Sequence, residues 1–208
     1  MGKTAVAVLA ILTGVMLSGC AWGKGSTFPP EQNVIYVSKD GGLYTAIVEH
    51  YDPSDTGYSA DELKDMAFKE AADYNKEYGG GQERVSVAEC TIEEGRATLV
   101  HKYAAAEDLC SFTQITQDTS NHTEHLQITT NSVYLTGNDS DGGWTDARKN
   151  SSTTLGTVRK KKDLPLIVIT GPATVQTEGR ILYYSGAVSL ADEFTAQVSE
   201  GEGYIVFK

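Results

Sequence analysis

A short apolar segment near the start of the chain limits how this protein can fold. Ala5–Leu17 has Thr13 as its only polar residue, and Lys3 precedes it. A helix that crosses a bilayer needs about 20 apolar residues, whereas the apolar region of a secretory signal peptide has about 7–15. The length therefore predicts a signal peptide. No second apolar run of spanning length follows, so we expect the rest of the chain to fold in water.

The apolar segment ends in Leu17-Ser18-Gly19-Cys20, where two small residues precede a cysteine. The tetrapeptide resembles the lipobox of bacterial lipoprotein signal peptides, Leu-(Ala/Ser)-(Gly/Ala)-Cys, at all four positions. The resemblance implies that residues 1–19 are removed and that the Cys20 thiol carries a diacylglyceryl group. Two acyl chains give stable attachment, so the expected location is the outer face of the cell membrane. The alternative is a short buried helix that ends in this tetrapeptide by chance.

Charge and composition exclude two broad classes of protein. The formal net charge of −11 disfavours nucleic acid as a partner, because a chain of this charge repels phosphates. A hydrophobic content of 40% and eleven tyrosines argue against global disorder. We expect no cofactor besides the covalent lipid, and an envelope protein or a glycan as partners besides the membrane.

The patterning after the signal peptide predicts an α+β fold in four consecutive parts. Residues 20–33 are rich in Gly, Ser and Pro and predict a tether, and residues 34–115 predict a compact α+β unit. Residues 116–163 are polar and predict a loop-rich connection, and residues 164–208 predict a β-rich unit.

The α+β unit is predicted to run β-β-α-β-β-α, with helices laid over an antiparallel sheet. Ser59 followed by Glu62 forms a capping box for a helix that ends at Gly79-Gly80-Gly81. A second helix is expected at Ala104–Phe112. The four expected strands are Val34–Val37, Leu43–Tyr51, Arg84–Ile92 and Arg96–Tyr103.

Further strands are predicted after this unit from β-rich runs bounded by turn residues. They are Leu126–Leu135, Leu166–Thr170, Thr174–Gln176, Arg180–Tyr184, Phe194–Val198 and Tyr204–Phe207. Leu190–Val198 fits a short helix as well as a strand, and the pattern does not decide between them.

Residues 34–112 are similar to the GerMN-type domain of spore-forming bacteria, which is often found on lipoproteins. The similarity lies in the leading hairpin, the helix, and the turn Glu93-Glu94-Gly95 between two strands. The C-terminal half has no counterpart in that domain, and the resemblance assigns a role to no residue.

Two cysteines remain once Cys20 is assigned to the lipid. Cys90 falls on a predicted strand and Cys110 on a predicted helix, and both patterns place the cysteine on an apolar face. Outside the cytoplasm a disulfide between them would persist. The alternative is two buried free thiols. A thiolate nucleophile is disfavoured because neither cysteine has an obvious base nearby in the sequence.

His122 and His125 are the only closely spaced histidines and form the candidate metal site. Their spacing allows a shared metal if the segment is helical, but it matches neither His-Glu-x-x-His nor His-x-x-Glu-His. Histidines in a solvated loop are the alternative.

The loop Asn138–Asp146 is the candidate binding site, because it combines the acidic Asp139 and Asp141 with glycines and Trp144. Its oxygen-rich composition suits calcium, although the spacing is not that of an EF-hand. An exposed Trp144 would instead anchor a ligand or partner. The third interpretation is a turn with the indole packed onto the domain.

Two further features have both structural and functional interpretations. The basic run Arg159-Lys160-Lys161-Lys162 is either a solvated turn or a contact for anionic lipid headgroups. Tyrosines on strands pack a sheet or form a sugar-stacking face. The adjacent Tyr183 and Tyr184 must point to opposite faces of a strand.

Several catalytic patterns are absent from the sequence, namely Gly-x-Ser-x-Gly, Ser-x-x-Lys, Cys-x-x-Cys, the Walker loop and the dinucleotide glycine pattern. We therefore expect a lipid-anchored envelope protein that acts as a binding or assembly module without covalent chemistry. The alternative is an envelope hydrolase that uses carboxylates or a metal near His122, His125 and Asp139–Asp146.

Overall fold

The computed structural model describes residues 30–52, 59–93, 95–135, 143–161 and 163–208. The predicted signal peptide, Cys20 and nearly all of the tether lie outside these residues. Within them, no helix combines the length and the apolar character that crossing a membrane requires.

The described residues form ten strands and four helices. The strands are β1 (Val34–Val37), β2 (Leu43–His50), β3 (Val85–Glu93), β4 (Arg96–Tyr103), β5 (Leu126–Thr130), β6 (Trp144–Asp146), β7 (Ser151–Thr153), β8 (Pro165–Thr177), β9 (Ile181–Leu190) and β10 (Thr195–Phe207). The helices are α1 (Ala60–Tyr78), α2 (Ala106–Ile115), α3 (Asn131–Tyr134) and α4 (Leu155–Arg159). The predicted α+β class is confirmed.

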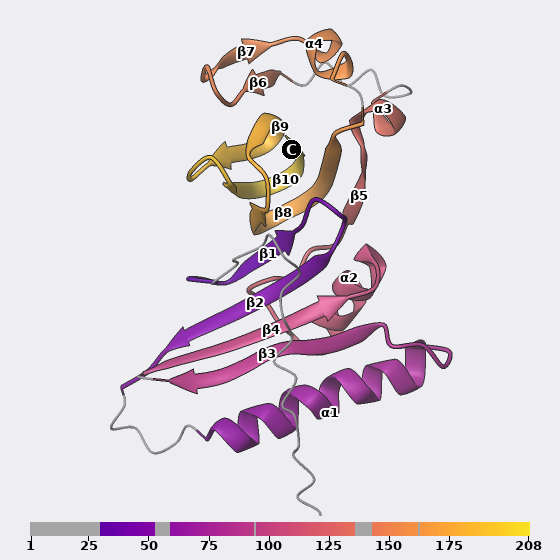
Figure 1. Ribbon diagram of the computed structural model, residues 1–208, viewed down its shortest axis with the longest axis vertical. Coiled ribbons are helices and arrows are strands. Elements are labelled where there is room, and N and C mark those ends of the chain that lie inside the picture. Colours follow the sequence, from indigo (N-terminus) through magenta and orange to yellow (C-terminus); the bar gives the residue numbers. More distant parts are fainter. Residues whose placement is uncertain (1–29, 53–58, 94, 136–142, 162) are drawn as a thin grey trace, which may run out of the picture.

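All ten strands belong to one mixed sheet, which corrects the prediction of purely antiparallel sheets. The order is β3-β4-β2-β1-β8-β10-β9-β6-β7, with β5 also paired to β8 (Figure 1). β1 and β8 are parallel, with Ile35 opposite Val175, whereas the other paired strands are antiparallel. The pairing of β1 with β8 joins the N-terminal strands to the C-terminal ones.

The predicted first hairpin is confirmed. β1 and β2 pair with Val34 opposite Ala46 and Val37 opposite Leu43. Gly41 has φ +86° in the connecting turn, a conformation that glycine adopts without the steric cost of a side chain.

Helix α1 begins and ends as the capping signals predict. The Ser59 side chain accepts a hydrogen bond from the Glu62 backbone N–H at 3.3 Å. The helix ends before Gly79, and Gly80 and Gly81 have positive φ. α1 packs along the edge strand β3 (Figure 1), with Ala67, Ala71 and Tyr74 buried.

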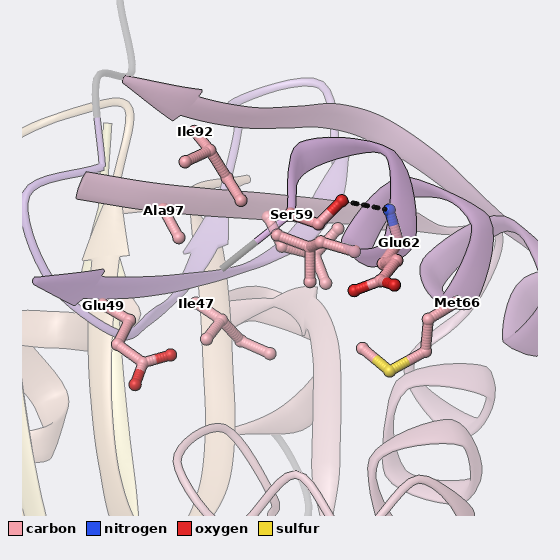
Figure 2. A pocket seen from close by; sticks show the side chains of 9 residues that line it. Ile47, Glu49, Ser59, Glu62, Met66, Ile92 and Ala97 are labelled. Atoms are coloured by element: carbon pink, nitrogen blue, oxygen red, sulfur yellow. Dashed lines mark hydrogen bonds between the residues drawn. The ribbon is translucent and has the colours of Figure 1, made fainter. Parts of the chain in front are cut away.

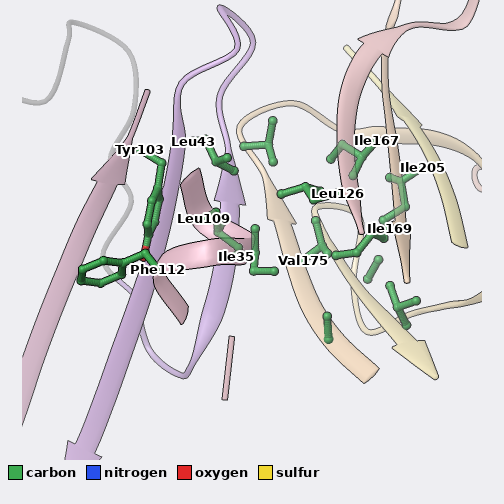
Figure 3. Packing of buried hydrophobic residues seen from close by; sticks show 14 of the residues in the cluster. Ile35, Leu43, Tyr103, Leu109, Phe112, Leu126, Ile167, Ile169, Val175 and Ile205 are labelled. Carbon is green, nitrogen blue, oxygen red and sulfur yellow. The ribbon is translucent and has the colours of Figure 1, made fainter. Parts of the chain in front are cut away.

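The largest hydrophobic cluster runs through both halves of the chain. It extends from Tyr103 of β4 through Ile35 of β1 to Ile205 of β10 (Figure 3). α2 covers this cluster with Leu109 and Phe112, which are 0% and 2% exposed. Burial of side chains from both halves in one cluster stabilises them together.

The polar stretch 116–163 holds more regular structure than its composition indicates. The predicted strand Leu126–Leu135 is too long, since β5 ends at Thr130 and α3 follows directly. β6, β7 and α4 were not predicted at all. Their packing depends on a few buried apolar residues, Leu135, Trp144 and Val158, which join a second cluster on β8 and β10.

Two predicted strands, Leu166–Thr170 and Thr174–Gln176, are one strand, β8. Pro172 suggested a break because proline removes a backbone donor. β5 pairs with β8 only up to Ile169, and β1 pairs only from Val175 onward. Pro172 therefore lies where β8 has a neighbouring strand on one side only, and the strand continues through it.

Two other predicted strands, Phe194–Val198 and Tyr204–Phe207, are likewise joined into β10. The glycine-rich segment between them forms a bulge at Glu200 and Gly201, opposite Gly171 of β8. The helical alternative for Leu190–Val198 is wrong, because most of this segment belongs to β9 and β10.

Candidate functional site

An apolar pocket of about 380 Å³ lies between the start of α1 and the sheet. This volume falls within the range of about 300–1,000 Å³ that is typical of small-molecule sites. The residues that line it are Ile47, Glu49, Ser59, Glu62, Leu63, Met66, Ile92, Ala97 and Leu99. Six of these nine side chains are apolar, and none is basic.

Strand register places the sheet side of the pocket. Ile47 of β2 pairs with Leu99 of β4, and Ile92 of β3 pairs with Ala97 of β4. Directly opposite residues of an antiparallel pair project from the same face, as do alternate residues of one strand. Three neighbouring strands therefore present short and branched apolar side chains to one space.

The helix side comes from the first two turns of α1. Leu63 and Met66 are three residues apart, which places them on one face of the helix. Met66 is 50% exposed, so its thioether borders both the pocket and solvent. Figure 2 shows Met66 facing Ile47 across this space.

Two carboxylates lie at the margin of the pocket, one from the sheet and one from the helix (Figure 2). Glu49 is in the exposed last part of β2, and Glu62 is in the exposed first turn of α1. The hydrogen bond from the Glu62 backbone to Ser59 fixes this turn. Asp61 is a further acid in the same turn and Lys64 is a base next to Leu63, so acids outnumber bases around the pocket.

The face of β4 that lines the pocket continues to His101, which is only 3% exposed. The His101 and Phe112 rings meet edge to face with centroids 4.9 Å apart. Burial lowers the pKa of His101 to about 4, so its imidazole is neutral near pH 7. Next to it, Tyr103 shares a hydrogen bond of 2.8 Å with Thr45, and burial raises the pKa of its phenol. These groups belong to the core beneath α2 and do not line the pocket.

A second pocket, of about 670 Å³, is polar and lies beside β9. Arg148, Arg180, Tyr184, Asp192 and Glu193 are among its lining residues. Several of these charges already have partners within the protein. Arg180 and Glu193 form an ion pair at 2.6 Å, and Asp192 accepts hydrogen bonds from the backbone N–H groups of residues 194 and 195. The polar side chains here mainly hold the surrounding turns together.

The two predicted metal ligands lie in the segment between α2 and β5, which is not helical. His125 is exposed, and His122 is half-buried with its Nδ1 3.3 Å from the Thr113 hydroxyl. The described part of the chain holds no group of three or more His, Cys, Asp or Glu side chains that could bind a metal. The geometry needed for a shared metal on a helix is therefore missing, and the metal site stays a prediction.

Trp144 lies on β6 and is 2% exposed, which corrects the idea of an exposed anchor. Its ring contacts that of Tyr204 at a centroid distance of 6.0 Å and joins the second hydrophobic cluster. The interpretation of an indole packed onto the domain is the one that fits. Asp139 and Asp141 lie outside the described residues, as does most of the loop proposed for calcium.

Cys90 and Cys110 are free thiols, and both are half-buried. The possible disulfide is therefore not formed in this structure, and the interpretation as two free thiols fits. Burial raises the pKa of both thiols, which lowers the fraction present as thiolate.

The basic run begins with Arg159 in the last turn of α4, and Lys160 and Lys161 after it are exposed. Lys162 lies outside the described residues. Among the tyrosines, Tyr183 is 2% exposed in the second cluster, whereas Tyr184 lines the polar pocket. The expected difference between these neighbours is confirmed.

None of the residues that line the apolar pocket was identified as a site residue from the sequence. The strands and the helix that carry them were predicted, and the spacing of Ile47 and Glu49, two residues apart, places both on one face of β2. The pairing of β2, β3 and β4 with α1 above them was needed to bring these side chains together.

The sequence matches no protein-family model, and it has no significant match among curated proteins or solved structures. The lipoprotein and GerMN-type resemblances therefore stay predictions.

Proposed function

We propose that this protein is a lipid-anchored, extracytoplasmic binding module that holds an apolar group of its ligand or partner between α1 and the sheet. The location follows from the apolar run Ala5–Leu17 and the lipobox that ends at Cys20. The binding role depends on one observation, the apolar pocket of about 380 Å³. A concave site with mainly apolar walls and a few polar groups at its margin is the usual form of a small-ligand site.

The character of the carboxylates favours binding over hydrolysis. Glu49 and Glu62 both belong to the exposed surface. Hydrolysis by a pair of carboxylates needs one of them in an apolar environment, so that it holds its proton near neutral pH. The apolar side chains of this pocket form its walls, and the two acids lie at the margin.

We further propose that residues 34–115 act as a β-β-α-β-β-α unit that carries the pocket, with residues 164–208 as a β-rich unit beside it. The order of the first six elements supports this division. All of the residues that line the pocket come from β2, α1, β3 and β4 or from the cap of α1.

Titration with the neutral apolar dye N-phenyl-1-naphthylamine tests the binding role. Dye fluorescence rises when the dye enters an apolar site, and we expect a saturable increase with one dye per protein. A weak, non-saturating increase, equal to that given by a denatured sample, would contradict the proposal. Replacing Leu99 by Gln places an amide in the pocket wall and should weaken dye binding. Circular dichroism of this variant shows whether it remains folded.

A further inference from the structure

We infer that the apolar pocket selects small cationic amphiphiles, in which an apolar chain is joined to a cation such as an alkylammonium group. This inference rests on the proposed binding function. It adds the charge of the ligand, which the apolar walls alone do not determine.

Two acids lie on different sides of the pocket. The Glu49 carboxylate extends from the strand side of the pocket and the Glu62 carboxylate from the helix side (Figure 2). A ligand whose apolar part occupies the space near Met66 would place its head group between or beside these carboxylates. No Lys, Arg or His is among the nine residues that line the pocket.

The electrostatic field around the pocket is also negative. Asp61 and Glu62 are both in the first turn of α1, and the whole chain has a formal net charge of −11. Lys64 follows as a charge of opposite sign, but the acids outnumber it, and an excess of one sign around an apolar concavity attracts ligands of the opposite sign and repels those of the same sign. A fatty acid or another anionic amphiphile should therefore bind more weakly than a cationic one of equal chain length.

The polar pocket beside β9 is less suited to select a ligand by its charge. There, Arg180 is paired with Glu193, and Arg148 lies 3.8 Å from Asp146. Neighbouring charges of both signs give that pocket little preference for either sign. The apolar pocket has acids alone among its charged lining residues.

The NMR signal of the Met66 methyl group reports directly on binding in the pocket. The chain has three methionines, and Met66 is the one within the described residues. Protein labelled with [¹³C-methyl]methionine is titrated with octyltrimethylammonium, octanol or octanoate, each below the concentration at which it aggregates. The Met66 signal is assigned by its loss in Met66→Leu. These probes share one chain length and differ in head-group charge.

We expect all three probes to move the Met66 signal, with the cation binding about tenfold more tightly than octanoate and octanol lying between them. Tenfold corresponds to about 1.4 kcal/mol, within reach of two exposed charge interactions. The variant Glu49→Gln/Glu62→Gln should remove the preference, so that the cation and octanoate bind with similar affinity. Salt at 1 M should also reduce the preference, because the screening length falls to about 3 Å.

Glu77→Gln is the matched control, since it removes an acid from the other end of the same helix. Glu77 lies fifteen residues beyond Glu62, or about 22 Å along the helix axis, well beyond the screening length of about 8 Å at physiological ionic strength. The cation preference should persist in this variant.

The outcomes separate this inference from the function on which it rests. Equal affinity for the cation and octanoate, or a preference for octanoate, would overturn the charge selectivity and leave the binding role intact. No response of the Met66 signal to any of the three probes would overturn the binding role itself. A preference that survives Glu49→Gln/Glu62→Gln would also overturn the assignment to these carboxylates.

Discussion

Met66 and Phe68 lie two residues apart on α1 and are almost equally exposed, at 50% and 48%, but only Met66 is among the residues that line the apolar pocket. Residues two apart on a helix point in different directions. The helix therefore turns one large apolar side chain toward the pocket and leaves the other on its outer surface. This pair allows the pocket to be tested with a control of matched exposure.

Met66→Asp should weaken binding of N-phenyl-1-naphthylamine about tenfold or more, because it removes an apolar wall and adds a charge beside the dye. Phe68→Asp makes a similar change in exposed apolar area and in charge, and should leave the dye affinity within about twofold of the parent protein. Fluorescence titration measures both values. Equal losses in the two variants would show that the dye does not bind in this pocket.

The free energy of unfolding should decrease as the pH is lowered, because of His101. Its pKa is about 4 in the folded protein against about 6.5 in an unfolded chain. Between these values the unfolded chain binds a proton that the folded chain excludes. The contribution of neutral His101 to the free energy of unfolding is therefore present above pH 6.5. It is lost as the pH falls to 4, by about 3 kcal/mol in total.

Urea unfolding at pH 7.5 and at pH 4.5 measures this loss. His101→Leu removes the titrating group and should reduce the pH dependence, whereas replacement of the exposed His125 by Gln should not. An unchanged pH dependence in His101→Leu would contradict the assignment to His101.

The two half-buried cysteines, Cys90 and Cys110, should be present as thiols. Non-reducing mass spectrometry of a denatured, alkylated Cys20→Ala protein should find both Cys90 and Cys110 alkylated. Before denaturation both should react slowly, because burial limits access and raises the pKa of each thiol. A mass that lacks two alkyl groups would reveal a disulfide, contrary to this structure.

Cys20→Ala should release the protein from the membrane fraction of its native host, because no acyl chain can then be attached. Ser18→Ala is a control that keeps both the thiol and the lipobox pattern. The measurement is fractionation followed by immunoblotting, together with mass spectrometry of the N-terminal peptide. A parent protein that keeps Met1 and stays in the soluble fraction would contradict the lipoprotein prediction.

Asn131→Ala should destabilise the protein by about 2 kcal/mol or more, since it leaves buried polar groups without partners. Asn131 is 0% exposed. Its amide group donates to the carbonyls of Val158 and Lys161, and its carbonyl oxygen accepts from the Leu164 N–H. Val133→Ala is the control, because Val133 is 72% exposed and should change stability by less than about 0.5 kcal/mol. Thermal unfolding of both variants tests the difference.

Capping and turn residues correctly predicted helices and strands whose ends are fixed by interactions within a few residues. The Ser59 cap, the glycines after Tyr78 and the turn at Gly41 act within a few residues, and they correctly mark α1 and the β1–β2 hairpin. The same reasoning failed at Pro172, where the outcome depends on which part of β8 has neighbours on both sides. It also missed α4, which depends on Val158 packing against distant strands.

By itself, the sequence determined the α+β class and most of the elements up to α2, because apolar periodicity, caps and turn residues operate at short range; the membrane address stays a prediction. Only the tertiary structure decided that β1 lies beside β8 and that Ile47, Ile92, Leu99 and Met66 border one space. It also decided that Trp144 is buried. These features depend on which distant segments meet, and the free energy of burying apolar surface settles that choice for the chain as a whole.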